Sequence, residues 1–195
     1  YDQLTADEQR DLLQLTHTLP ILSGLKANVT AADITIDLAK VVPMVAKPGQ
    51  LTNVTPLSKL GEQVVQSCLI GGATGSSIAD LRVVADVLKG HHVPMTMRLT
   101  ISPESNAVYL QALTEGLVDT LIDAGAQVIE PGYGSVRLPS KAVVGKGETQ
   151  LADGYWNYVG YNGTLDSQTF AASAKTVAET ALTQTVGQLS KAGEQ

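Results

Sequence analysis

Cysteine is almost absent from this sequence: Cys68 is the only one among 195 residues. A single thiol excludes an internal disulfide bond, and by itself it cannot provide the several thiolates that structural zinc and iron–sulfur sites require. A chain without disulfides fits a reducing compartment, so we expect a cytoplasmic location.

Clusters of basic residues and long apolar runs are also missing. Lys and Arg number 13 against 19 Asp and Glu, which gives a formal net charge of -6. Phosphate backbones are held mainly by clustered Lys and Arg, and a membrane-spanning helix needs about 20 apolar residues in a row. We therefore expect no nucleic-acid partner and no membrane span.

Aromatic residues make up only 4% of the chain, yet several gather in one short stretch. Tyr155, Trp156, Tyr158 and Tyr161 lie within seven positions of one another. These rings could stack on a planar ligand, but a domain with few aromatic residues also needs some of them for packing. Packing is therefore the favoured interpretation.

Strand and helix patterns alternate along the rest of the chain. Apolar runs predict strands at 64–70, 95–101 and 126–130, while leucine-rich stripes predict helices at 78–88 and between Pro103 and Gly125. Other patterns predict a helix at 6–17, a strand at 33–38, an irregular segment at 43–56 and a closing helix at 167–189. Long crossovers between strands indicate parallel pairing. The fold class is therefore α/β, a three-layer α/β/α domain with a mainly parallel sheet.

The chain begins at Tyr1 and not at Met. We expect one domain over residues 1–195, with its core at about 33–175, that has been cut from a longer protein. Its partners would then include the other domains of that parent protein.

In parallel sheets of this kind, ligands bind beyond the carboxyl ends of the strands, which directs attention to loops 71–77, 102–105 and 131–137. The first loop reads GGATGSS and joins a strand to a helix, where backbone amides and the helix dipole can hold an anion. It lacks the lysine of a nucleotide-binding loop, and a tight structural turn is the favoured interpretation. His91 and His92 follow Gly90 at a helix end with no third ligand nearby in sequence, so we expect no metal site.

Several segments, taken in order, resemble the third domain of the aconitase and isopropylmalate dehydratase family. Residues 70–81 (IGGATGSSIADL) are similar to the family's IGSCTNGRIEDL signature, and residues 130–136 (EPGYGSV) are similar to its EPGCxxC turn. Residues 34–38 (ITIDL), 43–46 (PMVA) and 53–56 (NVTP) fit its strand and PMVA crossing loop. The likeness runs from about residue 33 to 175 and implies an aconitase-like α/β fold.

The same resemblance draws attention to replaced cysteines. In the family, three cysteines hold a [4Fe–4S] cluster whose open iron acts on the substrate hydroxyl. The matching positions here are Ala73, Tyr133 and Val136, none of which carries a thiol, and Cys68 lies five positions before the first. On this basis we expect the domain to have no cofactor.

Two substrate-binding arginines of the family are replaced as well. The family's NRNFxGR segment supplies arginines that bind substrate carboxylates, and the matching stretch, 155–161 (YWNYVGY), has Trp156 and Tyr161 at their positions. We therefore expect no catalytic residues in this chain. The remaining candidates for binding an anion or another ligand are Thr74, Gly75, Ser76, Ser77, Ser105 and Asn157.

These replacements lead to two alternative functions. The first is a non-catalytic, hydro-lyase-like domain of the aconitase family that serves as a scaffold or interaction module. The second is a dehydratase or isomerase that acts on a small carboxylic acid without the cluster, which would make a small organic acid its partner.

Overall fold

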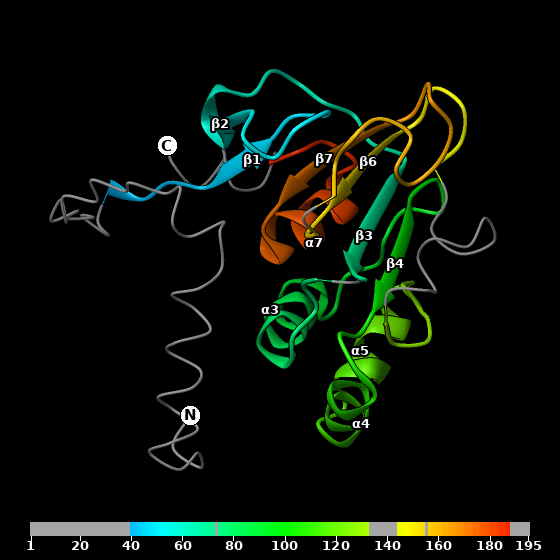
Figure 1. Ribbon diagram of the computed structural model, residues 1–195. Helices are drawn as coiled ribbons and strands as arrows, with labels where there is room; N and C mark the ends of the chain where they lie inside the picture. Colours follow the sequence, from blue (N-terminus) through cyan, green and yellow to red (C-terminus); the bar gives the residue numbers. More distant parts are fainter. Residues whose placement is uncertain (1–39, 73, 133–143, 155, 188–195) are drawn as a thin grey trace, which may run out of the picture. The chain divides into compact units, whose positions relative to one another are not determined.

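The computed structural model describes residues 40–187, apart from 73, 133–143 and 155 (Figure 1). The chain separates into two compact units, Tyr1–Lys40 and Val41–Gln195, and the described residues belong to the second apart from Lys40. The helix predicted at 6–17 and the strand predicted at 33–38 lie outside the described residues. A single domain with its core at 33–175 stays a prediction.

Seven strands of the described residues form one sheet in the order β2-β1-β7-β6-β3-β4-β5. The four parallel pairs are β3 with β4, β3 with β6, β4 with β5, and β6 with β7. The two antiparallel pairs are β1 with β2 and β1 with β7. The predicted α/β class with a mainly parallel sheet is therefore confirmed. The strands are β1 (Met44–Ala46), β2 (Val54–Pro56), β3 (Ser67–Gly71), β4 (Arg98–Ser102), β5 (Gln127–Val128), β6 (Thr149–Ala152) and β7 (Gln168–Ala172).

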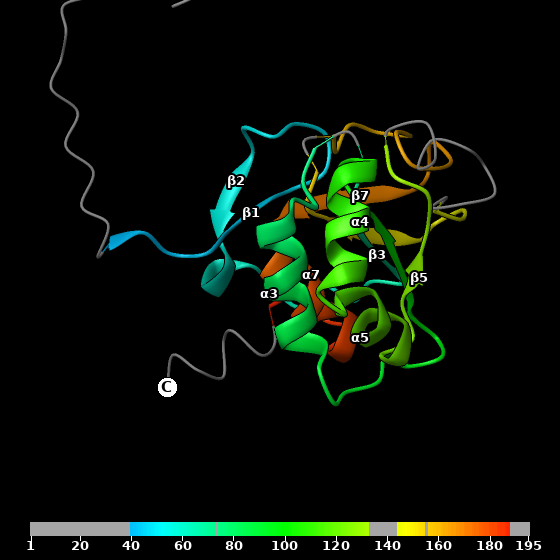
Figure 2. The ribbon, with the colours of Figure 1, turned by 90° about the horizontal axis from the view of Figure 1, so that it is seen from below.

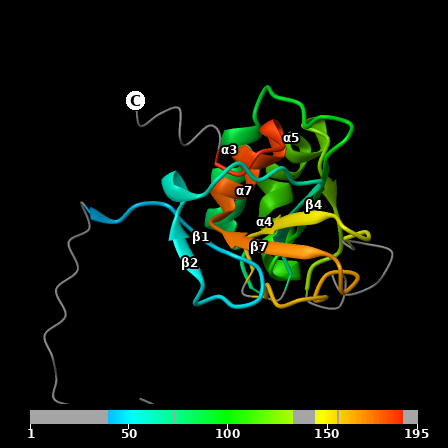
Figure 3. The same ribbon diagram turned by 90° about the horizontal axis from the view of Figure 1, so that it is seen from above.

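The described helices pack beside one another against this sheet. α3 contacts α7 and α5, and α7 also contacts β3 and β6. In Figure 2 the helices lie in front of the strands, and in Figure 3, seen from the opposite side, β7 lies in front of the helices. Their bounds are α3 (Ile78–Leu88), α4 (Asn106–Thr114), α5 (Leu117–Asp123) and α7 (Ala174–Thr183), with a short 3-10 helix, η2 (Leu57–Lys59).

The core lies between β3 and the helices: α7 contacts β3, and α3 contacts α7. Every residue of β3 is buried, as expected for a strand between two parallel neighbours. The bounds predicted for α3 are confirmed, because its apolar residues recur at helical spacing and are the ones buried. These are Leu81, Val84, Ala85 and Leu88.

The long helix predicted between Pro103 and Gly125 is wrong in one respect, because it is two helices. Gly116 adopts a left-handed conformation with φ 70°, which ends α4 and starts α5. The leucine stripe that predicted one helix consists of Leu110, Leu113, Leu117 and Leu121. Leu110 and Leu113 are exposed, and Ala112 is the buried residue of α4. The break rotates the α4 stripe away from the core.

Four strands were not predicted. The segment 43–56, expected to be irregular, forms the β1–β2 hairpin, and β6 and β7 lie in stretches predicted to be loop and helix. The closing helix begins only after β7, where the Ser173 side chain accepts a hydrogen bond from Thr176 N. β1 pairs with β7, and β6 with β3, across long stretches of sequence, so local sequence carries little signal for these strands.

None of the described helices has the length and apolarity that crossing a bilayer requires. That the chain binds no nucleic acid stays a prediction from its charge.

Candidate functional site

Two loops from distant parts of the sequence meet at the carboxyl ends of β3 and β6. The strands are neighbours with Leu69 opposite Ala152, and the next residue, Asp153, donates its backbone N–H to Leu69 O at 3.2 Å. The predicted loop 71–77 therefore lies beside the segment that follows β6. This is the edge where parallel sheets bind ligands.

The carboxyl group of Asp153 fills the amide-lined turn of the first loop. Its Oδ1 accepts from Gly71 N at 2.7 Å, and its Oδ2 accepts from Ser76 N at 3.2 Å. The pKa of Asp153 is raised to about 7, mainly because the carboxyl is buried and in smaller part because Asp80 is near, while the backbone hydrogen bonds act in the opposite direction. The turn, which was favoured as a structural turn and kept as a candidate anion site, thus holds an internal acidic group.

Glycines make this close approach feasible. Gly71 has φ 97°, and a Cβ there would lie 1.8 Å from Ser102 O. Gly75 has φ 86°, and a Cβ there would lie 2.6 Å from Asp153 Oδ2. Both conformations are open to glycine at little cost, and neither position has room for a side chain.

Two adjacent serines of the loop have different surroundings. Ser77 caps α3: its Oγ accepts from Asp80 N at 3.3 Å, while Asp80 Oδ2 accepts from Ser77 N at 3.1 Å. Ser76 has φ 59°, and its buried Oγ has no hydrogen-bond partner among the described residues. The anion-binding role predicted for both serines stays a prediction.

The structure separates Ser105 and Asn157. Ser105 caps α4, with its Oγ accepting from Val108 N at 3.3 Å. Asn157 joins the segment after β6 to the β1–β2 hairpin. Its side-chain Nδ2 donates to Lys47 O at 2.7 Å, and its backbone carbonyl oxygen accepts from Gly49 N at 2.8 Å. Their predicted ligand-binding roles also stay predictions.

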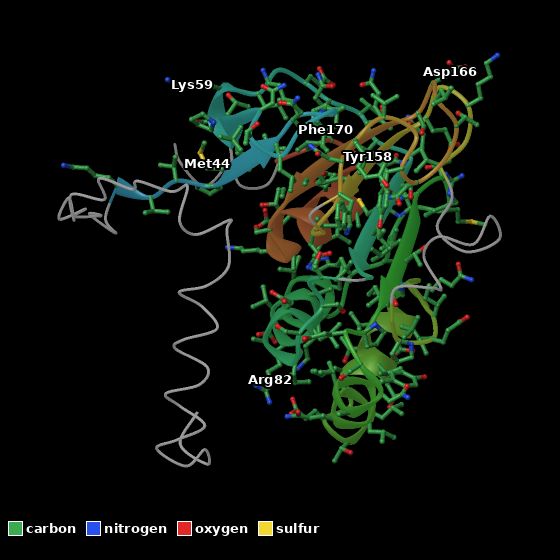
Figure 4. The ribbon with its side chains drawn as sticks, viewed as in Figure 1. Met44, Lys59, Arg82, Tyr158, Asp166 and Phe170 are labelled. Atoms are coloured by element: carbon green, nitrogen blue, oxygen red, sulfur yellow. The ribbon has the colours of Figure 1, made fainter. Side chains whose placement is uncertain are left out.

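The positions predicted to replace arginines form part of an aromatic cluster. The ring centroids of Trp156 and Tyr161 are 6.0 Å apart, and Tyr158 lies 4.9 Å from Tyr161 and 6.2 Å from Trp156. Figure 4 places Tyr158 near the strands, apart from Arg82 on α3. The predicted packing role of these rings is consistent with their mutual contacts.

A small cavity lies beside this cluster, with a volume of about 10 Å³, which is room for roughly one water molecule. Trp156 and Tyr161 contribute to its lining, as does Thr74, one of the predicted ligand-binding residues. The cavity is lined by Leu69, Gly71, Thr74, Ala152, Gly154, Trp156, Tyr161 and Asn162.

Sequence reasoning missed Asp153 and Asn162. Asn162 is buried, and its Nδ2 donates to Gln150 Oε1, while Gln150 Nε2 donates to Ser67 Oγ at 3.1 Å. The Asp-Gly pair at 153–154 is a turn signal, but the strand before it, β6, had not been predicted, so the pair did not mark a site. Asn162 offered no comparable signal, because its partner Gln150 lies in a strand that had not been predicted.

The described residues alone do not fit an iron–sulfur cluster. No three His, Cys, Asp or Glu side chains gather as a metal site in the part of the chain that the structure describes. Cys68 is buried within β3, and burial raises the pKa of its thiol, which disfavours a thiolate. Ala73, Tyr133 and Val136, the three positions aligned with cluster cysteines, lie outside the described residues.

Comparison with known proteins identifies relatives of this chain. A 3-isopropylmalate dehydratase large subunit from Clostridium kluyveri is 37% identical over 150 residues, which are 77% of this chain and 36% of that protein. A methanogen homoaconitase large subunit from Methanocaldococcus jannaschii is 34% identical over 150 residues, again 77% and 36% of the two chains. The chain spans little more than a third of the length of these relatives.

The prediction that the domain has no cofactor is wrong in the light of these matches. The relatives are a dehydratase and a homoaconitase, members of the group for which the resemblance implies a [4Fe–4S] cluster. Three replaced positions were too narrow a basis for predicting a cofactor-free protein.

The family assignment rests on more than individual relatives. The model of the aconitase family (aconitate hydratase) matches residues 58–184, more than half of the chain, and that span runs from η2 to the C-terminal cap of α7. Together with relatives more than a third identical over three quarters of the sequence, this shows that the chain belongs to the aconitase family.

Proposed function

We propose that this chain is a structural α/β domain of an aconitase-family large subunit, and that its own loops do not bind the carboxylate groups of a substrate. The observation that carries the proposal is the position of Asp153. Its carboxyl oxygens accept from Gly71 N and Ser76 N, the amides that an external anion would use. An incoming carboxylate would also be repelled by the ionised form of Asp153.

The side chains around the neighbouring cavity support the same proposal. Among the described residues that line it there is no Lys, Arg or His, and the two positions aligned with arginines hold Trp156 and Tyr161. Bidentate binding of a carboxylate depends on guanidinium groups, which an indole or a phenol does not replace.

The test is calorimetric titration of the full chain with 3-isopropylmalate and with citrate at pH 8. We expect no saturable heat at ligand concentrations up to about 10 mM. One-to-one binding with a Kd below about 1 mM would overturn the proposal.

A pair of variants adds a positive readout to this test. Asp153→Ser removes the internal carboxyl from the amides and is expected to tighten sulfate binding at least about fivefold. Asp166→Ser removes an exposed carboxylate on another loop and should leave sulfate binding unchanged. Equal sulfate binding by Asp153→Ser and the parent chain would contradict the role given to Asp153.

The relatives favour a second candidate, a hydro-lyase activity of the complete protein to which this domain contributes directly. They are named as dehydratase and homoaconitase large subunits. If the domain binds substrate, Thr74→Val or Ser105→Ala should lower kcat/KM of the complete protein at least about tenfold. If it is structural, both variants should retain activity once folded.

The proposal includes the setting of the domain. As part of a large subunit it would work beside other domains of its parent protein or a second subunit, and its single cysteine fits the cytoplasm.

A further inference from the structure

One of the residues that line the cavity at the β3 and β6 ends, Asn162, has a buried polar atom with no partner among the described residues. Asn162 is 4% exposed, and its Nδ2 is already used in the hydrogen bond to Gln150 Oε1. Its Oδ1 is buried and has no hydrogen-bond partner among the described residues. A buried carbonyl oxygen without a donor is costly, so this oxygen is suited to a ligand that brings an N–H or O–H group.

Further acceptors line the same space. Thr74 O and Oγ1 and Gly71 O lie 3.6–3.9 Å from the point where a Cβ on Gly154 would stand. Gly154, Gly71 and Thr74 all line the cavity. Oxygen atoms therefore lie close to the residues that line this cavity, which favours a ligand rich in donors.

Aromatic rings form another side of the cavity. Trp156 and Tyr161 line it with a ring separation of 6.0 Å, and Trp156 is 43% exposed. The faces of indole and phenol rings attract cations, indole most strongly. Rings of this kind are poor partners for a carboxylate.

The charges around the cavity also favour a cation over an anion. Among the described lining residues there is no Lys, Arg or His. The Asp153 carboxyl is hydrogen-bonded to Gly71, one of those lining residues, and the whole chain carries a net charge of -6. Both features lower the energy of a positive charge placed there.

We propose that this cavity binds the ammonium head of a small amine, with N–H groups donated to Asn162 Oδ1 and the charge held against Trp156 and Tyr161. A single ammonium group matches a space of about one water molecule. The inference goes beyond the proposed function: carboxylate binding would overturn that function and leave this site untouched, and failure of amine binding would overturn only this site.

Trp156 is the only tryptophan in the chain, so its fluorescence reports on this cavity. The full chain is titrated at pH 8 with methylammonium chloride, with tetramethylammonium chloride and with potassium chloride, at constant ionic strength. We expect a saturable change with methylammonium and a Kd of about 10 mM, given so few ligand atoms. Tetramethylammonium cannot donate a hydrogen bond and should bind at least about fivefold more weakly.

Two tyrosine variants form a matched pair. Tyr161→Leu removes a ring that lines the cavity and should weaken methylammonium binding at least about fivefold, whereas Tyr158→Leu removes a ring of the same cluster that does not line it and should change binding less than about twofold. Equal losses in both variants would indicate binding to the outer ring surface and would overturn the site.

A second readout does not depend on any variant folding. In ¹⁵N-labelled protein, methylammonium should shift the side-chain amide signals of Asn162 and the indole signal of Trp156. Potassium that matches methylammonium in affinity, or saturation without a shift of the Asn162 amide, would overturn the assignment to an amine.

Discussion

Asp153 shows how one buried acidic group links pH to stability. Its pKa in the folded chain is about 7, against an ordinary value near 3.9 in an unfolded chain, so between those values the folded state binds more protons. The free energy of unfolding must then fall as the pH rises from about 4 to 7, with no further loss from this group above that range. The proton on Asp153 therefore stabilises the folded chain at low pH.

We predict that Asp153→Asn removes this pH dependence. The parent chain should lose stability between pH 4.5 and pH 8, and the variant should not. The difference in free energy of unfolding, variant minus parent, should therefore be larger at pH 8 than at pH 4.5 by on the order of 2–4 kcal/mol. Urea denaturation at both pH values measures the change. Asp166→Asn, on an exposed loop, is the control and should show a difference independent of pH. A constant difference for Asp153→Asn would refute the assigned pKa.

At the scale of elements, the Ser77–Asp80 capping box fixes the start of α3. Because the Ser77 hydroxyl satisfies Asp80 N, Ser77→Ala should lower the free energy of unfolding by about 1–2 kcal/mol. Thr114→Ala, at the exposed end of α4, is expected to change it by less than about 0.5 kcal/mol. Thermal or chemical denaturation compares the two, and equal effects would mean that the cap contributes nothing particular.

The same elements show what the sequence could predict. α3 has its signals close together, with a serine cap, a helical stripe and Gly90 after its end, and its bounds were predicted correctly. The region of α4 and α5 was predicted as one helix because the leucine spacing continues across Gly116, whose backbone conformation sequence alone does not reveal. β1 and β7 pair with each other across more than a hundred positions, so no local pattern marks either strand.

The candidate site, too, was predictable only in part. Its place at the carboxyl ends of the strands was predicted from the order of strands and helices. Its contents were not, because Asp153 and Asn162 act through partners that come near them only when β6 lies beside β3.

At the scale of the whole molecule, one edge of the sheet is markedly apolar. β2 is the last strand on its side within the described residues, and Val54, Met44, Val41 and Val42 near it are all exposed. Edge strands with exposed apolar side chains promote association between molecules.

We predict that Val54→Lys lowers the tendency of the chain to self-associate. A charge on the edge strand disfavours strand addition, so light scattering at high protein concentration should fall, with the sedimentation coefficient moving toward that of a monomer. Val83→Lys, an exposed valine on α3, tests for a general effect of charge. If both variants reduce scattering alike, the sheet edge is not responsible.

The hydrogen bond from Gly71 N to Asp153 joins groups 82 positions apart. During synthesis, β3 and α3 leave the ribosome long before β6 exists, so for that interval the amides of the β3–α3 turn have only water to bind. Contacts between distant segments also close slowly, since they must overcome the entropy of the intervening chain. The pocket can therefore form only after β6 and Asn162 have been synthesised, at least 80 positions after the turn that supplies its first wall.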